Sequence, residues 1–216
     1  VEDLYNNWFL GQLSESWTRA CEDELGKHGY ILNISKQKDF YKNKVQFADN
    51  RVFVIVSDSL RYEVAAVLAK ELRKETQSEV ALNSMQGIFP TITKFGMAAL
   101  LPHKELTAEI KSTTKTERLA VLADGASTES NNRENVLKKA NVNSVALQYK
   151  VLANLKRAER LDLVRGKNVV YIYHDKIDSA SHGDENSVFA ACDEAIEEIK
   201  NMIRIIVNDF GGTRVY

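Results

Sequence analysis

Three segments of the chain place polar side chains directly after apolar runs, in patterns that could bind a metal ion or a phosphate group. Asp58 follows VFVIV, Thr91 and Thr93 lie in FPTITKF, and HDKIDSASH follows VVYIY. In open parallel sheets, ligands bind beyond the carboxyl ends of the strands. We therefore expect these side chains to gather at one edge of a sheet.

Asp58 has two interpretations. As an N-cap, it would accept hydrogen bonds from the free N–H groups of the following helix. As a ligand, it would offer anionic oxygen to a divalent cation at a rigid strand end. Leu60, two residues later, disfavours a phosphatase with an Asp-x-Asp pattern. Arg61 could reach a phosphate group, although a solvent-exposed arginine in a first helical turn is the simpler interpretation.

Thr93 precedes a short helix expected at MAALLP, where unpaired N–H groups favour an anion such as phosphate. A threonine hydroxyl there could act as a nucleophile if a metal ion lowers its pKa. The alternative is a threonine N-cap, with Pro90 shaping the loop. This segment leaves both interpretations open, and Thr91 offers a second hydroxyl.

The segment HDKIDSASHGD is the richest in potential ligands. Its spacing would place three of them on one helix face, but the preceding strand and Gly183 favour a loop. An Asp-x-x-x-His loop can bring carboxylate and imidazole to one zinc ion, which favours Asp178 and His182 as ligands. We expect His174 to pack or hydrogen-bond at the strand end, and Asp184 to cap the next helix. The five candidates within eleven residues are His174, Asp175, Asp178, His182 and Asp184.

The elements that must position these residues alternate along the chain. The strands are predicted at RVFVIV, around residues 79–82, at RLAVLAD and at NVVYIYH. The helices are predicted at 60–72, 97–102, 133–140, 155–166 and 185–210, the last closed by Gly211 and Gly212. This order predicts an α/β fold with a mostly parallel sheet and helices on both faces.

Residues 1–48 differ from residues 49–216 and predict a helical N-terminal segment that packs on the main domain. Trp8 and Trp17 are interpreted as core or interface anchors. The chain of 216 residues has 44% apolar and 27% charged residues, as soluble globular proteins do. A net charge of −1 gives no reason to expect non-specific binding to nucleic acid or acidic membranes.

The two cysteines, Cys21 and Cys192, lie far apart and outside any CxxC pair, so we expect a reducing cytoplasmic setting. Cys192 falls within a helical pattern and is expected to be a small buried side chain. No apolar run approaches the length needed to span a membrane, and no signal peptide is recognisable.

Together, four long stretches resemble the PglZ family, a branch of the alkaline phosphatase superfamily associated with BREX bacteriophage-defence systems. They are VFVIVSDSLRYEVA, FPTITKFGMAALLPHK, LADGASTESNNR and VVYIYHDKIDSASHGDENSVFAACDEAIEEI. LYNNWFL and SESW also resemble the segment that precedes this domain. The long stretches are specific, whereas DSLR or DxxxH alone would not be.

The resemblance implies a phosphatase or phosphodiesterase with two metal ions, zinc or alternatively manganese. It assigns Asp58 and Thr93 to one ion, with Thr93 as nucleophile, and Asp178 and His182 to the other. It also implies a phosphate-ester substrate, with nucleic acid among the candidates, and protein partners in a defence complex. The alternative is a catalytically inactive phosphatase-fold module that serves as a scaffold.

Related phosphatases place a further Asp-His pair just after the next strand, whereas this chain stops at Tyr216. We therefore expect an excised piece of a longer protein, with an incomplete ligand set and a sheet edge open to self-association. Asp124 and Arg133 are second-tier candidates, for which a turn and a polar loop are the simpler interpretation. His103 is expected to be an exposed loop residue.

Overall fold

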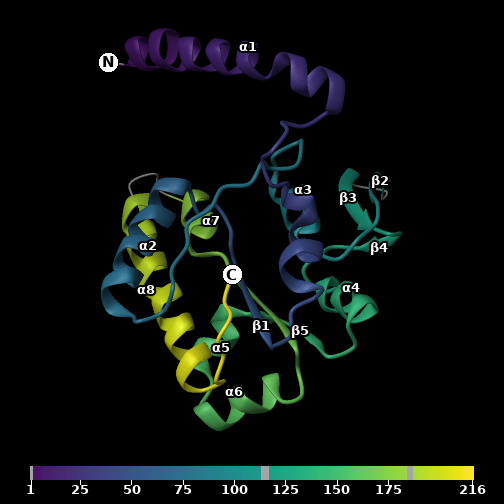
Figure 1. The fold of residues 1–216 in the computed structure, drawn as a ribbon, viewed down its shortest axis with the longest axis vertical. Coiled ribbons are helices and arrows are strands. Elements are labelled where there is room, and N and C mark those ends of the chain that lie inside the picture. Colours follow the sequence, from purple (N-terminus) through teal and green to yellow (C-terminus); the bar gives the residue numbers. More distant parts are fainter. Residues whose placement is uncertain (1, 113–116, 184–186) are drawn as a thin grey trace.

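The computed structural model of the chain describes residues 2–112, 117–183 and 187–216 (Figure 1). Its central sheet is parallel, with the strand order β1-β6-β5. The strands are β1 (Val52–Ser57), β5 (Ser144–Gln148) and β6 (Val169–His174). The register places Val52 beside Val169 and Ser57 beside His174, so β1 and β6 end side by side.

The C-terminal residues extend this sheet on the free side of β1. Phe53 donates its N–H to the carbonyl of Arg214 (3.0 Å), and Tyr216 donates to the carbonyl of Phe53 (2.9 Å). The bridge between Phe53 and Val215 is parallel. These residues therefore pair with β1 through a single bridge.

Both faces of the sheet are buried, and successive residues of β1 point to opposite faces. Val52, Val54 and Val56 pack on the face covered by η3, α3 and α4, whereas Phe53 packs on the face covered by α2 and α8. This arrangement confirms the prediction of an apolar parallel sheet between helical layers. The covering elements are η3 (Tyr41–Val45), α2 (Tyr62–Glu75), α3 (Thr93–Ala99), α4 (Arg133–Ala140) and α8 (Ser187–Asn208).

A second, antiparallel sheet was not predicted. It contains β2 (Leu106–Ser112), β3 (Glu117–Ala123) and β4 (Ala126–Ser127). The strand expected at RLAVLAD exists as β3, but it joins this small sheet rather than the parallel one. Its partner β2 is almost wholly exposed and so carries no apolar pattern. The strand expected at 79–82 is wrong, because these residues form no strand.

The segment after β6 is a helix, α7 (Lys176–Ser181), so the loop prediction for HDKIDSASH is wrong. Ile177 is buried, and Ser179 donates its N–H to the carbonyl of Asp175 (2.9 Å). Gly183 follows the end of the helix and does not prevent it. Two further helices, α5 (Tyr149–Asn154) and α6 (Arg157–Val164), connect β5 to β6.

The N-terminal segment is helical, as predicted, but it projects from the rest of the molecule (Figure 1). Trp8 and Trp17 are 57% and 59% exposed, so the prediction that they are core anchors is wrong. Cys21 is buried, whereas Cys192, expected to be buried, is partly exposed, and both thiols are free. The helical elements here are η1 (Leu4–Leu10), α1 (Gly11–His28) and η2 (Gln37–Asp39).

Within the described ranges, no helix combines the length and the apolar character that crossing a membrane requires.

Candidate metal centre

The ends of β1 and β6 bring two acidic side chains close together. Asp58 follows β1 and Asp175 follows β6, and the N–H of Asp58 donates to the carbonyl of His174 (2.8 Å). The ladder between the strands therefore continues one residue past Ser57. Because these are carboxyl ends of parallel strands, this is the edge where ligands bind in such sheets.

The turn after Asp58 is tied to α7. Ser59 adopts a positive φ of 62°, and its hydroxyl donates to Oδ1 of Asp178 (3.2 Å). Helix α2 begins only at Tyr62, with Arg61 at its N-cap and no side-chain capping hydrogen bond. Asp58 is therefore not the N-cap of this helix, and the capping interpretation is wrong.

The electrostatic setting of Asp58 suits a cation. Burial raises its pKa, and the negative charges of Asp178 and Asp175 raise it further. A hydrogen bond from the Ser59 backbone and the positive charge of Arg133 oppose this shift. The folded chain thus holds Asp58 where ionisation is disfavoured, and a bound cation would remove that penalty.

Asp175 is neutralised locally and is a weaker ligand candidate. Its carboxylate lies 2.9 Å from the ammonium group of Lys150. Burial works to raise the pKa of Asp175, but Lys150 lowers it on balance. This ion pair compensates the negative charge of Asp175. The negative charges of Asp58 and Asp178 are less compensated.

Asp178 and His182 lie one helical turn apart, at the beginning and end of α7. Nε2 of His182 is 3.6 Å from Oδ2 of Asp178. The side chain of His182 is 78% exposed, so the imidazole is accessible from solvent. The structure therefore brings together two of the predicted ligands, with Asp58 near Asp178. Asp184, expected to cap the next helix, lies outside the described residues.

His174 holds the strand ends to the helix layer, which confirms the prediction that it packs and hydrogen-bonds. Its side chain is buried, with Nδ1 2.9 Å from Oγ of Ser57 and Nε2 2.8 Å from Oε2 of Glu198. The ring also meets the edge of Tyr149. The sequence offered no signal for Glu198, which comes from the middle of α8.

Arg133, a second-tier candidate from the sequence, lies close enough to Asp58 for its positive charge to act on that carboxylate. Its guanidinium lies 4.5 Å from the ring centre of Tyr173, and Nε donates to the carbonyl of Thr128 (3.1 Å). Burial raises the pKa of Tyr173 to about 12, so this ring stays neutral. Arg133 is held near Asp58 by these contacts, in a position to meet a phosphate group.

Thr93 is the first residue of α3 and is exposed. Ile92 is the N-cap, and no side-chain capping bond is present, so the capping interpretation of Thr93 is wrong. Thr91 is also exposed, and its methyl group lies close to Gly87. Within the described residues, no hydrogen bond or ion pair joins either threonine to Asp58 or Asp178.

The remaining candidates have structural roles. Asp124 adopts a positive φ of 48°, and its carboxylate accepts the N–H groups of Lys104 and Glu105. The Glu105 hydrogen bond is the main cause of its lowered pKa. Arg61 lies exposed at the start of α2. His103 is partly buried, and its Nδ1 donates to the carbonyl of Leu101 (2.7 Å), so the expectation of full exposure is wrong.

The donor set fits a metal ion only in part. Asp58, Asp178 and His182 offer the oxygen and nitrogen ligands that zinc and manganese accept. Across the described ranges, however, no group of three or more His, Cys, Asp or Glu side chains converges closely enough to hold a metal ion. Catalytic zinc sites normally have three protein ligands.

A parallel sheet between helical layers, with acidic side chains beyond its carboxyl edge, is consistent with an alkaline phosphatase-like α/β domain. The family model of the BREX system PglZ alkaline phosphatase-like domain matches residues 39–216. The chain therefore belongs to the PglZ family.

Two curated relatives match the whole chain. It is 38% identical over 225 positions to the "Alkaline phosphatase-like protein BrxZ" of Escherichia coli O9:H4 (strain HS). It is 34% identical over 222 positions to the "Alkaline phosphatase-like protein PglZ" of Bacillus cereus (strain H3081.97). The chain spans 25% of the length of each of these relatives. No solved structure matches it.

Proposed function

We propose that this domain belongs to a metal-dependent phosphoric ester hydrolase that acts in a bacterial phage-defence system. The observation that carries the proposal is the placement of Asp58 beside Asp178 at the strand edge where ligands bind, where burial first and the charge of Asp178 second raise the pKa of Asp58. A structural role as a helix cap does not account for Asp58. A cation accounts for it, because it would compensate both carboxylates.

In this proposal Asp58 and Thr93 serve one metal ion, and Asp178 and His182 serve a second. Two bound zinc or manganese ions would supply positive charge for the phosphoryl group and lower the pKa of the nucleophile. Thr93 Oγ forms a bond to phosphorus, the bond between phosphorus and the ester oxygen breaks, and the proton of Thr93 passes through water to the departing alcohol. Water then cleaves the phosphothreonine. Arg133 positions the phosphate group during both steps.

The setting of the domain is also a proposal. Two free thiols suit a reducing cytoplasm. The exposed aromatic residues of η1 and α1 suit contacts with protein partners of a defence complex. The outer edge of residues 214–216 offers a surface for self-association. Experiments in cells test the cytoplasmic location and the protein partners. Sedimentation velocity at increasing concentration tests self-association.

The test compares the chain with a form extended to the length of its relatives, each with added zinc or manganese. Hydrolysis of a generic phosphate monoester and diester is measured for wild type and Asp58→Ala. We expect activity in the extended wild type and none in its variant. Equal activity of the two would rule out Asp58 as an essential ligand.

A second candidate function is a non-catalytic scaffold with the phosphatase fold. It is favoured by the absence, among the described residues, of any three-ligand group. The extended protein distinguishes the two functions. A scaffold would bind neither zinc nor manganese and would hydrolyse neither ester, while still associating with its partners.

A further inference from the structure

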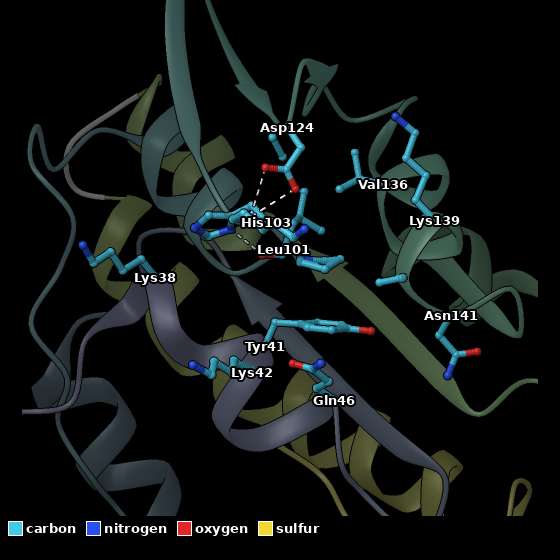
Figure 2. Close-up of a pocket in the computed structure, with 14 residues that line it drawn as sticks. Lys38, Tyr41, Lys42, Gln46, Leu101, His103, Asp124, Val136, Lys139 and Asn141 are labelled. Atoms are coloured by element: carbon cyan, nitrogen blue, oxygen red, sulfur yellow. Dashed lines mark hydrogen bonds between the residues drawn. The ribbon is translucent and has the colours of Figure 1, made fainter.

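A hollow of about 400 Å³ lies away from the candidate metal centre (Figure 2). It is enclosed by η3, the connection between α3 and β2, the end of β3 and the end of α4. Gln46 and Asn141 line it and also line a neighbouring hollow that includes Val52 and Val169. Since Val52 and Val169 begin β1 and β6, the hollow lies towards the amino ends of the strands, opposite Asp58.

Four lysines surround this hollow, whereas the chain as a whole has a net charge of −1. They are Lys38, Lys42, Lys104 and Lys139. Each is exposed, and none forms an ion pair with any residue in the described ranges. The one lining carboxylate, Asp124, is already held by backbone N–H groups. With four lysines and one carboxylate, the hollow carries a net positive charge.

The walls of the hollow combine apolar surface with hydrogen-bonding groups. In Figure 2 the Tyr41 ring lies across the centre, between Gln46 on one side and Leu101 with His103 on the other. Because Nδ1 of His103 donates to the Leu101 carbonyl, Nε2 is the ring atom left for a ligand. The amides of Gln46 and Asn141 can each donate and accept.

We propose that this hollow binds a small phosphorylated ligand of the nucleoside phosphate class. The lysines meet the phosphate groups, while the apolar wall and the two amides meet the base. The volume falls within the range of about 300–1,000 Å³ that is typical of small-molecule sites. A long nucleic acid is disfavoured, because its charge repeats along an axis and would need cations along a stripe rather than around one hollow.

The experiment measures binding of ADP, pyrophosphate and adenosine to the chain by titration calorimetry, with a chelator present to exclude metal-mediated binding. We expect saturable 1:1 binding of ADP. The double variant Lys42→Glu/Lys139→Glu should weaken it at least about tenfold, because two attractive charges facing the phosphate groups become repulsive. The matched control Lys70→Glu/Lys74→Glu reverses two exposed charges on α2 and should leave ADP affinity unchanged.

Adenosine and pyrophosphate show which part of ADP the hollow recognises. Adenosine should bind more weakly than ADP, because it lacks the phosphate groups. Binding of pyrophosphate as tight as that of ADP would overturn the nucleoside part of the proposal. Absence of ADP binding, or equal loss in both double variants, would overturn the site. A single-stranded oligonucleotide that competes with ADP and binds far more tightly would show that the hollow is part of a nucleic-acid surface.

Discussion

The hydroxyl of Ser59 donates to the carboxylate of Asp178 across 3.2 Å, and this bond joins the turn after β1 to α7. Ser59 follows Asp58 directly, so the bond sets the distance between the two acids of the candidate metal centre. Carboxylates held together in this way repel each other until a cation or a proton arrives. The following predictions test what this arrangement does.

Asp58→Asn should stabilise the metal-free chain at neutral pH. The pKa of Asp58 is raised on folding, so the folded state binds the proton more tightly and loses stability as pH rises through that pKa. Asparagine cannot ionise, so the variant does not lose stability in this way as the pH rises. Thermal midpoints in a chelator should therefore be higher for the variant at pH 7, and the difference should shrink as the pH is lowered towards 4. A variant that is less stable at every pH would contradict this account.

Alanine substitution of the two histidines of the HDKIDSASH segment should change stability by very different amounts. His174→Ala empties a buried position and leaves the partly buried partners Ser57 and Glu198 without their hydrogen bonds, so urea unfolding should show a loss of about 2–4 kcal/mol. His182→Ala removes an exposed ring and should change stability by less than about 0.5 kcal/mol. Any weak zinc binding by the chain should be lost with His182→Ala. Equal stability losses would show that His182 is structural.

Thr93→Ala should abolish turnover in the extended protein while leaving stability within about 0.5 kcal/mol of wild type. Thr93 is exposed and forms no capping bond, so alanine removes no stabilising contact that the structure shows. Thr91→Ala is the matched control and should retain activity. If Thr91→Ala is inactive and Thr93→Ala is active, the nucleophile is the other threonine.

Gly212→Ala should destabilise the packing of the C-terminal residues against the sheet. A Cβ at this position would lie 2.5 Å from a side-chain atom of Ile206 and 2.6 Å from the ring of Phe53. Overpacking of this kind costs about 1–3 kcal/mol. Gly26→Ala, in helix α1 with no atom within 4 Å, should instead stabilise the chain by up to about 1 kcal/mol. Chemical denaturation of both variants measures the contrast.

Zinc should bind the chain weakly. Within the described ranges there is no group of three or more metal-ligand side chains, and each proposed site draws on two residues. Calorimetric titration of the chain and of the extended protein checks this expectation. Tight binding of two zinc ions by the chain alone would show that its ligand set is already complete.

The sequence by itself determined two of the three parallel strands, most of the helices and the family, but it gave no prediction of the third parallel strand, β5. Each of these rests on a local signal: apolar runs for β1 and β6, helical spacing for α8, and long specific stretches for the PglZ resemblance. Asp58, Asp175 and Asp178 were placed at one sheet edge by the rule for parallel strands alone. Local periodicity can be detected in the sequence because it depends on residues that are near neighbours in the chain.

Only the tertiary structure decided how the candidate site is assembled. The contact of His174 with Ser57 joins residues 117 positions apart, and no local pattern encodes it. Helix α7 forms although its sequence resembles a loop, because Ile177 is buried. Likewise β3 pairs with the exposed β2 instead of joining the parallel sheet, and Trp17 remains exposed because α1 projects from the body. In each case the outcome depends on which distant surfaces meet, and that is settled by the packing of the whole chain.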